Sequence, residues 1–210
     1  MGMFISQLTV IGELRRAQVS KTQVPILQTL ASFLSCILWF KYGLIKHDTT
    51  VSLVNGVGTM VTMYILGCFW VYDSSPRRVE SGVLVASIIS VSLVGYVDYA
   101  KDVWSLELYS MICCLMSLVF LGSPLGHIGK VVESRDASVL LPSVAALALA
   151  NNMLWCVYGV MREDPYMFVP NIIGSSFCAL QLALVAYYGR AIAEKSKELA
   201  ALDDNMAHLI

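Results

Sequence analysis

The sequence predicts an all-α membrane protein whose seven transmembrane helices form two parallel three-helix bundles joined by a linker helix. Composition, charge spacing and an internal repeat lead to this prediction. The 210 residues are 57% hydrophobic and 14% charged, with a mean hydropathy of +0.69. A soluble domain averages roughly 45–50% apolar and about 25% charged residues. The composition therefore indicates a protein embedded in a lipid bilayer. The formal net charge of −1 gives no basis for nucleic-acid binding.

Six long segments contain no Asp, Glu, Lys or Arg. Each holds 17 to 25 residues, which matches the ~20 apolar residues that a helix needs to cross the hydrocarbon of a bilayer. We therefore predict a transmembrane helix in each of residues 22–40, 49–72, 81–97, 108–129, 137–161 and 165–189.

The N-terminal segment 1–12 is apolar but short, and even when it is counted to Leu14 a helix at ~1.5 Å per residue spans only ~21 Å. It lacks the basic start and small-residue cleavage site of a signal peptide. We interpret it as a first helix with a shortened outer end. The predicted organisation is a first repeat (1–72), a linker helix with its loops (73–104), a second repeat (105–189) and a cytoplasmic tail (190–210).

Orientation follows from the distribution of Lys and Arg. Ten of the 14 lie on the side that holds loops 15–21, 73–80 and 130–136 and the C-terminal tail, and four lie on the other side. The positive-inside rule places the first side in the cytoplasm. The N-terminus is then outside, and the C-terminus is cytoplasmic.

The chain repeats itself at a shift of 116 positions. When residues 38–72 are aligned without a gap to the residues 116 positions later, nine are identical, including Trp39 with Trp155 and Asn55 with Asn171. Each repeat holds three helices, and segment 81–97 is left over as a fourth. One extra crossing between two triplets makes them parallel, an arrangement found in transporters.

Trp39, Asn55, Trp155 and Asn171 lie at one predicted depth. Each is eight residues from the centre of an outer turn, or ~12 Å below it. A single Trp could instead belong to an interfacial aromatic belt, and a single Asn could join two helices. Duplication at one depth favours a binding pocket.

The chemistry of this layer suits a small neutral sugar. Indole faces pack on C–H groups, and carboxamides bond to hydroxyls. Ser35 and Asn151 lie one turn further in, where they could extend the pocket or only satisfy backbone groups. The layer carries no charge, so an ionic substrate fits less well and we expect no metal or other cofactor. Proton coupling is not expected, because no ionisable carboxylate or amine lies mid-membrane.

Other residues are candidates for gates at the two ends. The expected outer gate comprises Tyr42, Lys46, Tyr158 and Asp164, although such residues could also anchor helices at the interface. Prolines weaken the helix ladder, so we expect cytoplasmic hinges at Pro25, Pro124 and Pro142. Pro142 could alternatively be a helix-starting proline.

The chain resembles the SWEET (MtN3/saliva) sugar transporter family. The resemblance covers about residues 3–188 and rests on five stretches: LWFKYG from Leu38, VNGVG from Val54, GSPL from Gly122, WCVYG from Trp155, and DPY…VPN between Asp164 and Asn171. It implies a 3+1+3 uniporter that moves mono- or disaccharides, glucose-like sugars first, by alternating access. It also implies pocket roles for the two Asn and two Trp, and an outer gate of Tyr and Asp.

Three alternatives remain at this point. A PQ-loop carrier of another small solute would want a Pro-Gln dipeptide and a pocket acid, and neither is present. A non-transporting subunit or scaffold would fit the shortened first helix. An enzyme is least favoured, because no segment pairs a nucleophile with a base or carries a metal motif. We expect a plasma-membrane protein, with Golgi or another endomembrane as the alternative, that forms homo- or hetero-oligomers with family members.

Overall fold

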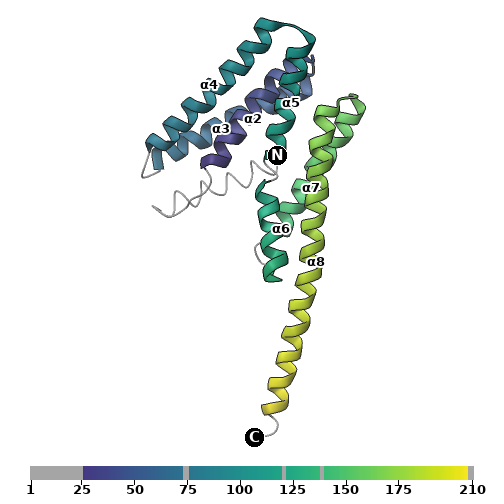
Figure 1. The fold of residues 1–210 in the computed structure, drawn as a ribbon. Coiled ribbons are helices and arrows are strands. Elements are labelled where there is room, and N and C mark those ends of the chain that lie inside the picture. The colour runs from purple at the N-terminus through teal and green to yellow at the C-terminus, as the bar shows by residue number, and fades with distance from the viewer. Residues whose placement is uncertain (1–25, 73–75, 120–121, 138–139, 208–210) are drawn as a thin grey trace.

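The computed structural model describes residues 26–72, 76–119, 122–137 and 140–207, and within these all regular secondary structure is α-helical (Figure 1). The chain is an all-α, multi-pass integral membrane protein. The expected first helix (1–14) and Pro25 lie outside the described residues. Five described helices are long and apolar enough to cross a membrane: Ile26–Ile45, Thr49–Val71, Pro76–Ala100, Pro142–Met161 and Pro165–Gly189.

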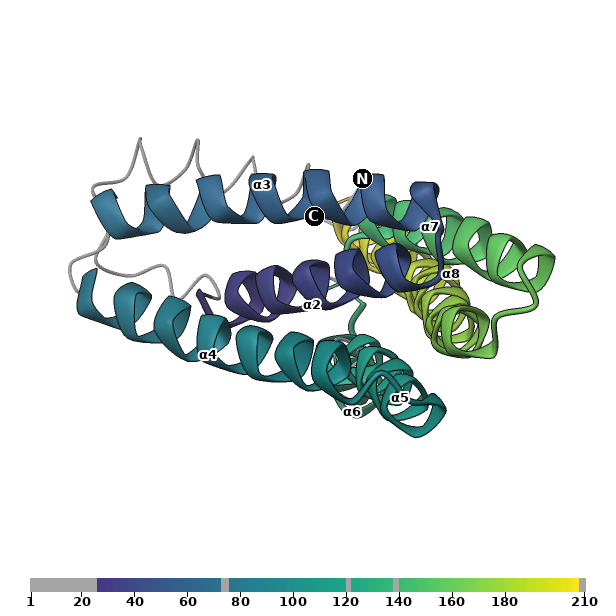
Figure 2. The same cartoon turned by 90° about the horizontal axis from the view of Figure 1, so that it is seen from above.

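The first half of the chain is a helical hairpin backed by the linker helix. Helices α2 (Ile26–Ile45) and α3 (Thr49–Tyr72) pack along their length, and α4 (Pro76–Ala100) lies against α2 on the side away from α3 (Figure 2). An ion pair joins α2 to α4 near the end of α2 that leads into the α2–α3 turn, with Lys41 Nζ 2.5 Å from Asp98 Oδ1.

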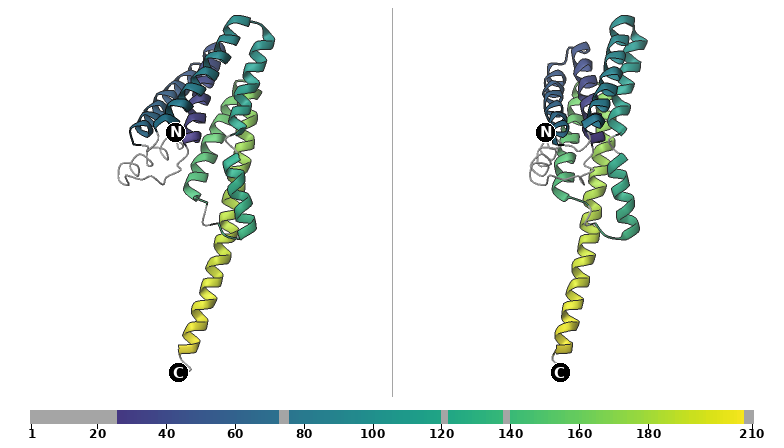
Figure 3. Two further views of the ribbon diagram at one scale, coloured as in Figure 1. Left: turned by 60° about the vertical axis from the view of Figure 1, so that its left-hand side comes forward. Right: turned by 90° about the vertical axis from the view of Figure 1, so that its left-hand side faces the viewer.

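The second half has a matching hairpin of α7 (Pro142–Met161) and α8 (Pro165–Ala207). Helix α8 also packs against α5 (Val103–Val119) and α6 (Gly122–Ser134). It continues as helix beyond residue 190, where the sequence changes from apolar to charged, and extends far past the other helices (Figure 3).

The single helix expected over 108–129 is described as α5 and α6, which lie on either side of residues 120–121, and these two residues are outside the described ranges. Pro124 lies in α6. Pro142 is the first residue of α7, the position that the helix-starting alternative gives it.

The two hairpin turns have the same backbone. His47 and Glu163 lie 116 positions apart and both adopt left-handed backbone, with φ of 51° and 53°. In each turn the following Asp donates its N–H to the carbonyl of a glycine five residues earlier, at 2.8 Å for Asp48 and 2.9 Å for Asp164. The repeat seen in the sequence is thus a repeat of three-dimensional structure.

Each of those glycines allows its hairpin to close. A Cβ on Gly43 would lie 2.7 Å from the backbone N of Ser52, and a Cβ on Gly159 would lie 2.8 Å from the backbone N of Phe168. Real Cβ atoms do not approach backbone so closely, so only glycine permits these helix pairs to meet next to the turn. This close approach fixes the position of the turn residues, which carry the site described next.

Candidate functional site

Asp48 and Asp164 begin α3 and α8, and both cap their own helix. Asp48 Oδ1 accepts from the backbone N–H of Val51 at 3.0 Å, and Asp164 Oδ1 accepts from that of Tyr166 at 3.1 Å. Aspartate is a favoured residue before a helix because its carboxylate satisfies free amides of the first turn. Capping holds each carboxylate at the turn of its hairpin, and the carboxylate keeps further lone pairs that can accept hydrogen bonds.

Those lone pairs are used by tyrosines of the opposite repeat. The Tyr42 hydroxyl donates to Asp164 Oδ2 at 2.5 Å, and the Tyr158 hydroxyl donates to Asp48 Oδ1 at 2.8 Å. The two bonds are equivalent under the shift of 116, and each joins one repeat to the other. We call these four residues the outer latch. Because the two hairpin turns meet at the same end of the molecule, the repeats run parallel.

Two cations make the halves of the latch unequal. Arg162 Nε lies 3.1 Å from Asp48 Oδ2, whereas Lys46, its equivalent, places Nζ 5.8 Å from the centroid of the Tyr42 ring. Lys46 is exposed, and a cation–π contact at an exposed site contributes only about 0.5–1 kcal/mol. Asp48 is buried, and removing one partner of a buried charge is strongly destabilising. The Asp48 half of the latch is therefore the more strongly held.

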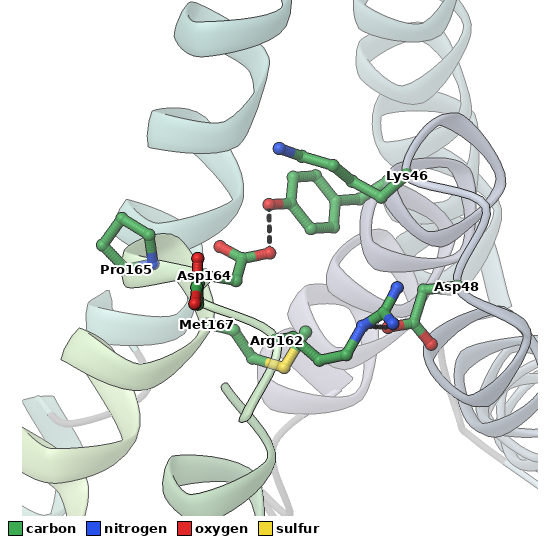
Figure 4. A pocket seen from close by; sticks show the side chains of 8 residues that line it. Lys46, Asp48, Arg162, Asp164, Pro165 and Met167 are labelled. Carbon is green, nitrogen blue, oxygen red and sulfur yellow. Dashed lines mark hydrogen bonds and ion pairs between the residues drawn. The ribbon is translucent and has the colours of Figure 1, made fainter. Parts of the chain in front are cut away.

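The latch surrounds a small cavity of about 100 Å³ (Figure 4). Figure 4 shows residues of both hairpins around it, with Lys46 and Asp48 from the first facing Asp164 from the second. Charged groups line it, so it differs in chemistry from the uncharged layer predicted further in. The complete lining is Tyr42, Lys46, Asp48, Arg162, Glu163, Asp164, Pro165 and Met167.

Each latch tyrosine packs edge-on against the tryptophan one turn deeper in its own helix. The ring centroids of Trp39 and Tyr42 are 5.1 Å apart at 74°, and those of Trp155 and Tyr158 are 5.8 Å apart at 89°. Edge-to-face contacts at this spacing are attractive. The latch is thus in direct contact with both predicted pocket tryptophans.

The two predicted pocket asparagines are equivalent in their contacts too. Asn55 Nδ2 donates to the Val51 carbonyl at 2.9 Å, and Asn171 Nδ2 donates to the Met167 carbonyl at 2.6 Å. Each side chain is partly buried and is held along its own helix. Among the described residues neither Oδ1 has a hydrogen-bond partner, so one strong acceptor remains on each amide.

The remaining predicted site residues have fewer contacts. Ser35 and Asn151 are partly buried, and neither forms a side-chain hydrogen bond to another described residue. Pro124 is described only through the backbone of α6.

Four residues that stand out in the structure were not among those predicted. Asp48 and Arg162 could have been found from the repeat, since they are the equivalents of Asp164 and Lys46. Ser117 and Ser175 carry no such signal. Trp39 Nε1 donates to Ser117 Oγ at 3.1 Å, a contact between residues 78 positions apart. Ser175 Oγ is, among the described residues, the buried side-chain polar atom without a hydrogen-bond partner.

Comparison with known proteins gives consistent matches. A family model described as "Sugar efflux transporter for intercellular exchange" matches residues 1–77 and 107–192. The chain is 29% identical to the mouse sugar transporter SWEET1 over 90% of this chain and 86% of the relative. It is 28% identical to the Dictyostelium discoideum protein of that name, over 77% and 76%. It is 25% identical to the rice bidirectional sugar transporter SWEET7b, over 79% and 65%.

A solved structure of a eukaryotic SWEET transporter superposes with a TM-score of 0.83 at 20% identity, covering 90% of each chain. Two parallel three-helix bundles joined by a linker helix are thus the architecture of this chain.

Proposed function

The chain belongs to the MtN3/saliva (SWEET) family of sugar transporters, and we propose that it carries small neutral sugars passively across a membrane in both directions. The family is one of transporters rather than enzymes. Relatives named bidirectional sugar transporters support movement in either direction. Mono- or disaccharides are the proposed substrates, with glucose-like sugars preferred.

The outer latch is the observation that carries this proposal. Its hydrogen bonds run between the repeats, through Tyr42 to Asp164 and through Tyr158 to Asp48. Bonds that cross the interface break when the hairpins separate and form again when they meet. The latch is therefore suited to close the outer end of a central path in one state and to release it in another, as alternating access requires. Lys46 is proposed to assist closure through the Tyr42 ring.

The proposed sugar site lies between the repeats, beneath the latch. Asn55 and Asn171 each keep a carbonyl acceptor without a partner among the described residues. A sugar hydroxyl is a donor that can meet such an acceptor. Trp39 and Trp155 supply ring faces for the C–H surface of the sugar. Ser35 and Asn151 are proposed to extend the site by one helical turn.

The proposed inner gate uses prolines on the cytoplasmic side. Pro124 lies in α6, and Pro142 begins α7. Proline has no N–H to donate to the preceding turn, so a helix bends more readily where a proline lies. Pro25 is proposed as the corresponding position in the first repeat.

We propose the plasma membrane as location, with the N-terminus outside and the C-terminus in the cytoplasm, as the Lys and Arg distribution indicates. The alternative is an endomembrane such as the Golgi. Homo- or hetero-oligomers with family members are the proposed assembly.

Reconstituted flux tests the function. The full chain in proteoliposomes should accelerate entry of radiolabelled glucose when the gradient points inward and its exit when the gradient points outward, with saturation in both cases. Sucrose run in parallel defines the size preference. Flux of both sugars no faster than in protein-free liposomes would contradict the proposal.

A further inference from the structure

The two repeats differ in how far their polar groups are already satisfied. Trp39 and Trp155 are equivalent positions, as are Thr59 and Ser175. In the first repeat both groups have partners. In the second repeat, among the described residues, neither does.

The Trp39 indole N–H is held by α5. It donates to Ser117 Oγ at 3.1 Å, and the Ser117 hydroxyl in turn donates to the Cys113 carbonyl at 3.2 Å. Because the one hydroxyl proton of Ser117 is directed at that carbonyl, its oxygen is left as an acceptor for the indole. Trp39 is only 9% exposed, so loss of the acceptor would leave a buried donor without a partner, which is unfavourable. The bond therefore orients Trp39 and removes its N–H from contact with a ligand.

The Trp155 indole N–H has no such partner. It is partly buried, and no described side chain or carbonyl accepts a hydrogen bond from it. Its ring is otherwise packed like that of Trp39, edge-on against the tyrosine one turn away. The two indoles therefore differ in one respect: the Trp39 N–H is already bonded, whereas within the described part of the chain the Trp155 N–H is free to donate to a ligand.

The hydroxyls one turn beyond the asparagines show the same contrast. Thr59 Oγ1 donates to the Asn55 carbonyl at 2.9 Å. Ser175 follows Asn171 by the same four residues and faces the same side of its helix, but its buried Oγ has no partner. A buried hydroxyl without a partner is unfavourable and normally bonds to a water molecule or a ligand.

We propose that hydrogen bonding to the sugar is carried mainly by the second repeat, through the Trp155 N–H and the Ser175 hydroxyl, with Ser117 as a positioning residue that turns Trp39 into an apolar face. This inference rests on the proposed sugar transport. It adds that a pocket built from a sequence repeat is chemically asymmetric. Apart from the two equivalent asparagines, the sugar would stack on Trp39 in the first repeat and would form hydrogen bonds with Trp155 and Ser175 in the second.

Matched variants of the full chain in proteoliposomes test the asymmetry. Trp39→Phe and Trp155→Phe both keep a ring and lose an N–H, and we expect Trp155→Phe to raise the KM for glucose about fivefold more than Trp39→Phe does. Ser175→Ala should raise KM by a similar factor while Vmax changes less. Thr59→Val should leave KM within about twofold, because its hydroxyl bonds its own helix. Ser176→Ala is the control, since that exposed hydroxyl donates to the Ile172 carbonyl.

A second measurement reports on Ser117 without transport. In protein labelled with ¹⁵N at the Trp side chains, Ser117→Ala should shift the Trp39 indole N–H resonance and Ser117→Thr should restore it. Glucose titration should shift the Trp155 resonance more than the Trp39 resonance. Equal KM effects of the two Phe variants, or a larger glucose shift at Trp39, would overturn the inference while leaving sugar transport intact. A wild-type chain that moves neither sugar would overturn the proposed function, and the inference with it.

Discussion

The Tyr42 and Tyr158 hydroxyls bond to carboxylates that the opposite repeat has already fixed by helix capping. The latch is therefore preorganised on the acceptor side, and each bond needs only a tyrosine to arrive. The strength of the latch depends on the two tyrosine hydroxyls and the two aspartate carboxylates. Residue-scale predictions follow from removing those groups one at a time.

Removing the latch hydroxyls should open the outer end. Met167 is 3% exposed and lines the cavity inside the latch, so Met167→Cys provides a reporter for a membrane-impermeant thiol reagent added outside. Tyr42→Phe or Tyr158→Phe should each speed labelling by about five- to tenfold, as expected for about 1 kcal/mol per bond, and the double variant more. Tyr99→Phe is the control, because Tyr99 is 92% exposed on α4. Labelling as slow in the double variant as in its parent would contradict the latch.

The two carboxylates should not be equivalent. Asp48→Asn and Asp164→Asn both retain a capping side chain, but only Asp48 also pairs with an arginine. We expect Asp48→Asn to lower the melting temperature in detergent by more than Asp164→Asn, because it leaves Arg162 without its carboxylate. Equal shifts for the two variants would show that Arg162 contributes nothing to the latch.

At the scale of the elements, the hairpins depend on close helix contact beside each turn. Gly159→Ala places a Cβ 2.8 Å from the backbone N of Phe168, which cannot move aside without separating α7 from α8. We expect a loss of about 1–3 kcal/mol, seen as a fall in melting temperature of several degrees.

Gly95→Ala supplies the matched control, because a Cβ at Gly95 meets nothing within 4 Å. It should be neutral or slightly stabilising, since alanine is the better helix former. A melting temperature for Gly159→Ala as high as that for Gly95→Ala would be inconsistent with this hairpin geometry.

Much of the helical architecture could be predicted because charges are excluded from the bilayer and so mark helix ends. The segment predicted as one helix over 108–129 is helical on both sides of residues 120–121, in α5 and α6, and its continuity across these two residues stays a prediction. Asp48 was missed even though the repeat pairs it with Asp164. Ser117 could not have been found, since its contact with Trp39 joins helices far apart in sequence.

At the scale of the whole molecule, the repeats meet at the latch, and the sugar layer proposed beneath it contains no Asp, Glu, Lys or Arg. A site in such a layer has no side chain that could bind and release a proton during transport. We therefore expect glucose flux in proteoliposomes to be unchanged when a protonophore collapses an imposed proton gradient. Flux that falls with the gradient would indicate coupling to an ion and contradict a passive mechanism.

The most direct test of the central claim is glucose flux by Asn55→Ala and Asn171→Ala variants, normalised to the amount of protein in the membrane. Each substitution removes a carbonyl acceptor placed at equivalent positions beneath the latch, where a sugar hydroxyl left without a partner is unfavourable. We predict normal membrane insertion and at least a roughly tenfold loss of flux for Asn171→Ala. Wild-type flux in both variants would contradict a sugar site between the two repeats.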